Sequence, residues 1–249
     1  MLFSIATIAC CGSTLVRRCN DDGDEDNPDL PRRERWPAQC GRADMSFSRH
    51  NPSPRFLELM QLYRRLHEEG ERRLGLEPEA TYPGKSLFPH AKRIKDLIAS
   101  TGAQTLLDYG CGKGYQYNPT KIAIPGEGNW DSVIDYWDVD EVCCYDPCYE
   151  PYCKLPEGKF DGVISTDVLE HCPEGDVRWI VAEIFSYATR FVFANIACYP
   201  ALTTLPNGEN AHCTVRPMMW WKAIFDEAAK DHPGVTWKLV VEDHGNRDS

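Results

Sequence analysis

The segment TLLDYGCGKG at residues 105–114 decides the fold of this chain. Its first half is a short apolar run of the kind that forms a buried strand. Its second half carries glycines at positions 110, 112 and 114, which permit positive φ and let a ligand approach the backbone closely. Asp108 stands at the end of the strand, where a carboxylate can meet a cationic or hydroxyl-bearing group. The sequence therefore predicts a strand that leads directly into a ligand-binding turn.

The spacing of this segment is D-x-G-x-G-x-G. A dinucleotide site prefers G-x-G-x-x-G, with the pyrophosphate at a helix N-terminus. A carboxylate placed ahead of the turn would repel a pyrophosphate, whereas it would suit the ammonium end of an amino acid. The spacing therefore disfavours a nicotinamide-dependent oxidoreductase.

Strands and helices alternate after residue 102. Apolar runs predict five strands, at residues 105–109, 141–145, 160–165, 190–196 and 235–241. Apolar positions at helical spacing predict a helix between the third and fourth of these strands and another from Pro217. This alternation is typical of an α/β fold with a mostly parallel sheet covered on both faces, whose ligands bind at the carboxyl ends of the strands.

The chain before this region divides into two parts. Residues 1–50 contain an acidic run and several prolines, so we expect a disordered extension. Residues 51–102 are expected to form a helical cap, with one helix starting at Ser53-Pro54 and a second starting near Pro89 and ending at Gly102. Residues 103–249 are then the cofactor-binding domain.

The stretch LLDYGCGKG, residues 106–114, resembles the first motif of the class I S-adenosylmethionine-dependent methyltransferases, and the resemblance extends over about residues 85–242. It implies a Rossmann-like three-layer sandwich, methyltransferase activity and S-adenosylmethionine as the cofactor. It also implies that the turn lies against the methionine part of that cofactor. The residues assigned to this contact are Asp108, Gly110, Cys111, Gly112 and Gly114.

A second feature of that family is an acid at the tip of the second strand, which holds the ribose hydroxyls. Asp146 matches it, although Asp146-Pro147 also fits a simple turn. Residues 115–140 form a longer insert than the family pattern has. The stretch 146–160 is too short for a full helix and a strand, so we expect an incomplete edge of the sheet.

Residues 160–171, FDGVISTDVLEH, resemble the fourth-strand region of the same family. The strand ends in polar residues that the resemblance directs towards the donor sulfonium and the acceptor. We therefore assign Ser165 and Thr166 to cofactor binding and Asp167 to the catalytic site.

Three interpretations of Asp167, Glu170 and His171 remain open. His171 could act as a general base, because its ordinary pKa suits that task. The three side chains could bind a divalent metal, because i, i+3 and i+4 positions share one helical face. Small-RNA 2′-O-methyltransferases resemble this with E-x-x-E-H and a later His, for which His212 is available, but the Asp in first position weakens the match. Glu170 and His171 could also merely cap and orient the helix.

The loop at residues 197–216 is expected to lie above the strand ends. His212 in this loop is the second candidate for acid/base work, against the alternative of an ordinary loop histidine. The predicted catalytic residues are therefore His171, His212 and Asp167, and a divalent metal is the less favoured cofactor.

Composition limits the partners. The 249-residue chain has a net charge of −11 and a pI of about 5.1, and it shows no basic face for long nucleic acid. No segment is long and apolar enough to cross a bilayer. Twelve cysteines in a chain of this length predict mostly reduced thiols and a cytoplasmic location. The sequence leaves a homo-oligomer open.

The sequence thus predicts an S-adenosylmethionine-dependent methyltransferase that acts on a hydroxyl or amine of a small polar metabolite or sugar-like acceptor. Two alternatives stay open. One is a noncatalytic protein that binds the same cofactor and regulates a partner, and the other is a metal-assisted 2′-O-methyltransferase of an RNA end.

Overall fold

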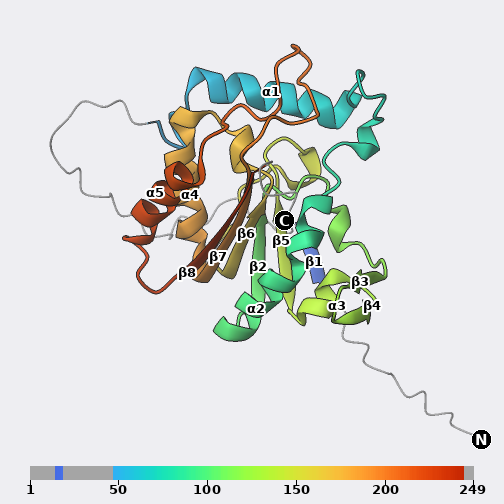
Figure 1. Cartoon of the computed structure of the whole chain (residues 1–249), viewed down its shortest axis with the longest axis vertical. Helices are drawn as coiled ribbons and strands as arrows, with labels where there is room; N and C mark the ends of the chain where they lie inside the picture. Colours follow the sequence, from blue (N-terminus) through green and yellow to red (C-terminus); the bar gives the residue numbers. More distant parts are fainter. Residues whose placement is uncertain (1–14, 19–46, 244–249) are drawn as a thin grey trace, which may run out of the picture.

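The computed structural model describes residues 15–18 and 47–243 (Figure 1). Its centre is a six-stranded sheet in which every neighbouring pair is parallel. In spatial order the strands are β1 (Leu15–Arg18), β5 (Glu141–Tyr145), β2 (Thr105–Tyr109), β6 (Phe160–Thr166), β7 (Ala188–Ala197) and β8 (Thr236–Glu242). The five strands predicted from apolar runs coincide with five of these, and β2 and β5 match to the residue.

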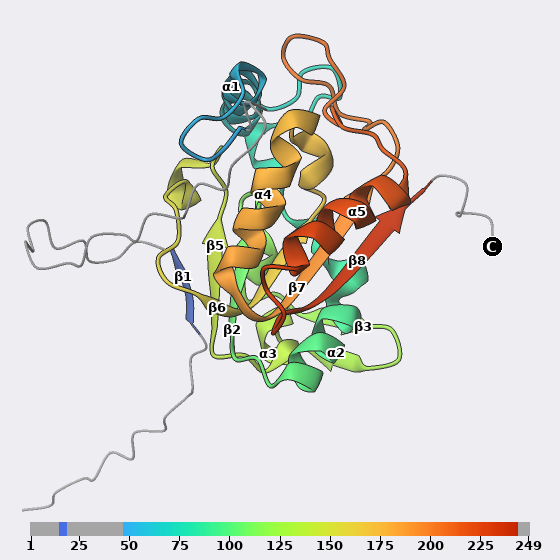
Figure 2. The ribbon, with the colours of Figure 1, turned by 90° about the vertical axis from the view of Figure 1, so that its left-hand side faces the viewer.

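Helices cover both faces of the sheet, which makes the Rossmann-like three-layer sandwich that the sequence predicts (Figure 2). The helices α4 and α5 pack on one face, and α2 and α3 on the other. The helix bounds are α1 (Pro54–Glu69), α2 (Ala91–Thr101), α3 (Val133–Trp137), α4 (Glu174–Tyr187) and α5 (Met218–Ala229). Short 3₁₀ helices span Pro78–Ala80, Lys85–His90, Tyr115–Tyr117, Glu150–Tyr152 and Leu169–His171.

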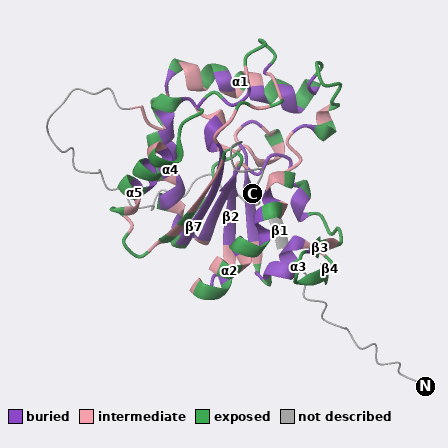
Figure 3. Cartoon of the chain, in the orientation of Figure 1, coloured by how far each residue is buried: buried purple, intermediate pink, exposed green. Residues whose placement is uncertain are grey.

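Alternation along each strand divides the core between the two faces. In β2, Leu107 belongs to the cluster under α4 and α5, whereas Leu106 belongs to the cluster under α2 and α3. Both side chains are fully buried, and Figure 3 shows the central strands buried between the helical layers. A strand covered on both faces needs a continuous apolar run, which is why the sequence predicts it so well.

The edge of the sheet differs from the prediction. The position beyond β5 is taken by β1, whose residues 15–18 pair in register with residues 141–144. These four residues lie within the segment 1–50 that was expected to be irregular, and residues 1–14 and 19–46 lie outside the described part of the chain. The insert at residues 115–140 contains α3 and a small antiparallel hairpin, β3 (Ile122–Ile124) and β4 (Gly128–Trp130).

Helix α1 lies across the end of the sheet at which the strands terminate (Figure 1). As predicted, Ser53 caps it by accepting a hydrogen bond from the N–H of Phe56 at 3.0 Å. Ser53 also donates its own N–H, at 3.0 Å, and its hydroxyl to the buried carboxylate of Asp176 on α4. This buried contact holds α1 in place over the strand ends. None of the described helices combines the length and the apolar character needed to span a membrane.

Candidate functional site

The glycine turn after β2 is held by the end of the neighbouring strand β5. The N–H groups of Gly110 and Cys111 both donate to the carbonyl of Tyr145, at 2.7 and 3.1 Å. The N–H of Gly112 donates to Oδ2 of Asp146 at 2.9 Å. Because these donors come from three successive residues, the turn keeps one shape beside the carboxyl end of the sheet.

The glycines of the turn are required by backbone conformation and by space. Gly110, Gly112 and Gly114 have φ of 89°, 59° and 67°, a region that side chains rarely adopt. A Cβ at Gly110 would lie 2.4 Å from the side chain of Val168, and one at Gly112 would lie 2.2 Å from the carbonyl oxygen of Tyr82. Close packing therefore explains these glycines independently of any ligand.

Asp108 is a functional candidate that packing does not explain. Its side chain is buried at the tip of β2, and Oδ2 accepts hydrogen bonds from Gln116 Nε2 at 2.9 Å and Tyr117 OH at 2.8 Å. Its other oxygen, Oδ1, is buried without a partner. Burial raises the pKa of Asp108 to about 6, although the two hydrogen bonds oppose this rise. A buried carboxylate oxygen without a donor is costly, so the site is suited to a cationic or donating ligand.

The sequence reasoning missed Gln116 and Tyr117, the two partners of Asp108. Both are buried and lie in the 3₁₀ helix that follows the glycine turn, within the insert. In the sequence they are marked only by their position directly after the glycine motif. A polar and an aromatic residue at such a position do not by themselves indicate contact with Asp108.

Asp146 supports the turn and also borders a cavity. Oδ1 accepts the N–H of Cys148 at 2.8 Å, and Oδ2 accepts that of Gly112. Burial raises the pKa of Asp146 to about 6, against the opposing effect of these backbone donors and of Lys113. The backbone contacts fit the Asp-Pro turn that was the alternative interpretation, while the position at a cavity wall keeps Asp146 available to a ligand.

Two adjoining cavities lie at the carboxyl end of the sheet. The polar chamber has among its lining residues Ser86, Asp108, Gln116, Thr166, Tyr199 and His212. The apolar chamber is bordered on one side by α1 and has among its lining residues Phe56, Leu59, Met60, Tyr63, Val168 and Ile180. Their common wall consists of Tyr82, Gly110, Gly112, Asp167 and His171. The glycine turn therefore separates a polar space from an apolar one.

Most of the predicted site residues border these chambers. Asp108, Gly110, Cys111, Gly112, Thr166, Asp167, His171 and His212 line the polar chamber, and Asp146 lines the apolar one. Gly114 and Ser165 line neither. Gly114 lies beneath the ring of Tyr152, with 2.9 Å between that ring and a Cβ built on the glycine, and Ser165 is fully buried within β6. The packing of the fold therefore keeps both Gly114 and Ser165 away from the cavity walls.

The predicted helical face of Asp167, Glu170 and His171 does not form. Asp167 has φ of 61°, and the 3₁₀ helix begins only at Leu169, so the i, i+3, i+4 relation does not apply. Glu170 is fully buried and accepts the N–H of Ala197, and burial holds its pKa well above the usual range. Glu170 therefore has the orienting position described by the third interpretation.

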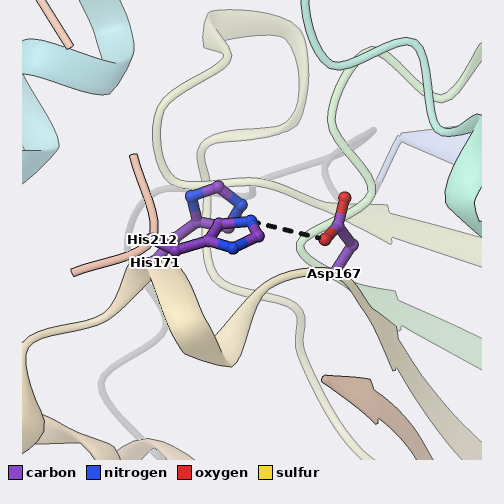
Figure 4. Close-up of side chains that lie close together, drawn as sticks. All are labelled: Asp167, His171 and His212. Carbon is purple, nitrogen blue, oxygen red and sulfur yellow. Dashed lines mark ion pairs between the residues drawn. The ribbon is translucent and has the colours of Figure 1, made fainter. Parts of the chain in front are cut away.

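Asp167 and His171 instead lie close to His212, which comes from the loop at residues 197–216 (Figure 4). Nδ1 of His171 lies 3.0 Å from the carbonyl oxygen of Ala211, and Nδ1 of His212 lies 2.6 Å from that of Tyr199. The two rings are nearly perpendicular, with centroids 4.8 Å apart. Nε2 of His212 lies 3.8 Å from Oδ1 of Asp167.

The surroundings of His171 make it a weak base. Burial, with a smaller contribution from His212, lowers its pKa to about 4, although Asp167 acts in the opposite direction. A general base works best with a pKa near the operating pH, so this environment favours the neutral imidazole as a ligand or orienting group over a proton acceptor.

No family model matches the sequence, and comparison with curated proteins and with solved structures also gives no match. The function is therefore inferred from the geometry of the two chambers.

The substitution Asp108→Asn should stabilise the free protein at neutral pH. Raising the pKa from 3.8 to about 6 corresponds to a penalty of about 3 kcal/mol for the ionised form. Removing that penalty stabilises the variant, but the buried amide of the new Asn lacks a full set of hydrogen-bond partners, which offsets about 1–2 kcal/mol of the gain. We expect a net rise of about 1 kcal/mol in the free energy of unfolding at pH 8, measured by urea denaturation. The rise should vanish as pH falls from 6 to 4, because the wild-type carboxyl is then protonated.

Asp161→Asn is the matched control for that substitution. Although burial acts the other way, N–H groups of Gln104 and Thr105 and the side chain of Arg190 hold the pKa of Asp161 below its usual value. This control should lower the free energy of unfolding at pH 8. Equal destabilisation by both substitutions would contradict the account of Asp108.

Proposed function

We propose that this protein is an S-adenosylmethionine-dependent methyltransferase. The observation that carries the proposal is the buried, unpartnered Oδ1 of Asp108, a residue that lines the polar chamber. A carboxylate in this position is stabilised by a ligand ammonium group, and the adjacent glycine turn lets that ligand lie against the backbone. An amino acid joined to a nucleoside combines an ammonium group, which suits the polar chamber, with a nucleoside, which suits the apolar one.

The residues present fit this cofactor. Asp108 would bind the amino end of the methionine part, with Gly110 and Gly112 beneath it. The apolar chamber, with side chains such as Leu59 and Met60, would take the adenosine part. Asp146 has oxygen lone pairs beyond those used by backbone N–H groups, so it can accept a hydrogen bond from a ribose hydroxyl.

The cofactor, when bound, supplies a methyl group activated by the sulfonium. The methyl group would pass to an acceptor oxygen or nitrogen, which would lose a proton, while the sulfur would keep the electron pair of the broken methyl–sulfur bond. The chain itself has to align the acceptor and exclude water. Thr166 and His212 line the polar chamber beside Asp108 and are placed to orient a small polar acceptor.

The acceptor class follows from the same chamber. Its lining offers hydroxyl, amide, imidazole and carboxylate groups, which suit a hydroxyl or amine of a small polar metabolite or sugar-like group. A noncatalytic cofactor-binding partner would have no need of two histidines on the polar chamber beside Asp108. Turnover of the cofactor with a metabolite pool, followed by mass spectrometry, separates these two functions.

S-adenosylhomocysteine binding tests the role of Asp108. Calorimetry should show binding to the wild type and a loss of about 100-fold in affinity for Asp108→Asn, because a charge-assisted hydrogen bond contributes about 2–3 kcal/mol. Asp161→Asn, whose carboxyl lies outside both chambers, should bind as the wild type does. Thermal stabilisation by NAD and none by S-adenosylhomocysteine would refute the proposal in favour of an oxidoreductase.

Affinity for S-adenosylhomocysteine should also depend on pH. The ligand ammonium needs the ionised form of Asp108, whose pKa burial raises to about 6. Affinity should therefore rise as pH increases through 6 and level off above 7, and it should be about tenfold weaker at pH 5 than at pH 8. Titration calorimetry at both values, with thermal unfolding to verify that the protein is folded, measures this. Equal affinity at pH 5 and pH 8 would exclude an ionisable carboxylate at the cofactor.

A further inference from the structure

Three potential metal ligands converge on the wall of the polar chamber (Figure 4). Asp167 follows β6, His171 ends the 3₁₀ helix after it, and His212 comes from the loop between β7 and α5. One ligand atom of each lies within 4.8 Å of the others. These residues are separated by up to 45 positions in the sequence, so the fold itself assembles the cluster.

Backbone carbonyls set the orientation of both imidazoles. A carbonyl oxygen only accepts hydrogen bonds, so His171 and His212 each carry their ring proton on Nδ1 and donate it, to Ala211 and Tyr199 respectively. In the neutral form of each ring, Nε2 is then a lone-pair acceptor. This is the arrangement of metal-bound histidines, whose second nitrogen is held by a carbonyl or carboxylate.

The acceptors face one another without a donor between them. Nε2 of His212 lies 3.8 Å from a carboxylate oxygen of Asp167, too far for a direct hydrogen bond and close enough for a shared cation. A negative oxygen and two nitrogen lone pairs in one small space repel each other unless a positive charge lies among them. We propose that Asp167, His171 and His212 bind one divalent transition-metal ion.

The ligand chemistry selects the class of ion. Imidazole nitrogen suits zinc, iron, cobalt, nickel and copper, whereas magnesium and calcium prefer oxygen. Metal–ligand distances of about 2.1 Å in a tetrahedral site place the ligand atoms about 3.4 Å apart. The three ligand atoms lie within 4.8 Å of one another, so they have to close by up to about 1.4 Å. The side chain of Asp167, 43% exposed at the end of the strand, is the most accessible of the three for this adjustment.

Glu170 is not a ligand in this site. Its carboxylate is fully buried: Oε1 accepts the N–H of Ala197, whereas Oε2 has no hydrogen-bond partner among the described residues. The backbone carbonyl of Glu170 accepts the N–H of Thr214. Through these contacts Glu170 joins the 3₁₀ helix that carries His171 to β7 and to the loop that carries His212. It is a positioning residue for the two histidines.

Three protein ligands leave coordination positions open towards the polar chamber. On the basis of the proposed function, one of them would be open to an acceptor hydroxyl. A bound ion would lower the pKa of that hydroxyl, so that its proton could pass to solvent as the oxygen takes the methyl group. The site therefore favours an oxygen acceptor over an amine.

Cobalt(II) is the probe for this site. The full chain, stripped with a chelator, should bind one Co²⁺ and develop visible absorption bands, and Zn²⁺ should displace it while Mg²⁺ should not. Asp167→Asn and His212→Ala should each weaken binding at least about 100-fold, because each removes a direct ligand. Asn is chosen at position 167 because it tolerates the left-handed backbone found there. His50→Ala, which alters an exposed histidine outside both chambers, should bind like the wild type.

Absence of Co²⁺ absorption in the folded wild type would overturn the metal site. Equal binding by the wild type, Asp167→Asn and His212→Ala would also overturn it and would place the ion elsewhere, for example on free thiols. The titration contains no S-adenosylhomocysteine, so its outcome is independent of the cofactor assignment. Cofactor binding without metal refutes only the metal site, and metal binding without cofactor refutes only the proposed function.

Discussion

A carboxylate at the tip of the central strand is buried with one oxygen unpartnered, and the site is built around that constraint. Asp108 lies where β2 ends between β5 and β6, with one oxygen bound by Gln116 and Tyr117 and the other left without a donor. The turn that follows cannot relax away from it, because β5 holds its N–H groups through Tyr145 and Asp146. The protein therefore maintains an energetically unfavourable charge in a rigid setting, which is typical of a functional site.

The rest of the fold divides the space around this charge. Helix α1, anchored by Ser53 to the buried Asp176, closes the apolar chamber over the strand ends. The loop between β7 and α5 delivers His212 to the polar chamber, where it meets His171. A ligand that is apolar at one end and charged at the other would occupy both spaces and pass over the glycine turn between them.

Much of this architecture is predictable from the sequence because its determinants are local. Buried parallel strands need continuous apolar runs, and Ser53 and Gly102 mark the ends of helices through their capping chemistry. The edge strand β1 is not predictable in this way, because it has only four residues and its pairing depends on the distant β5. Within the site, the glycine turn and Asp108 are predictable from the spacing of the D-x-G-x-G-x-G motif. The left-handed backbone of Asp167, which cancels its helical relation to His171, depends on tertiary context.

The central claim is that Asp108 is the partner of the cationic end of the cofactor. A crystal structure of the protein with S-adenosylhomocysteine tests it most directly. The account predicts the ligand's ammonium nitrogen within about 3 Å of Oδ1 of Asp108, with the ligand lying over Gly110 and Gly112. A ligand bound elsewhere, with Oδ1 still unpartnered, would contradict it.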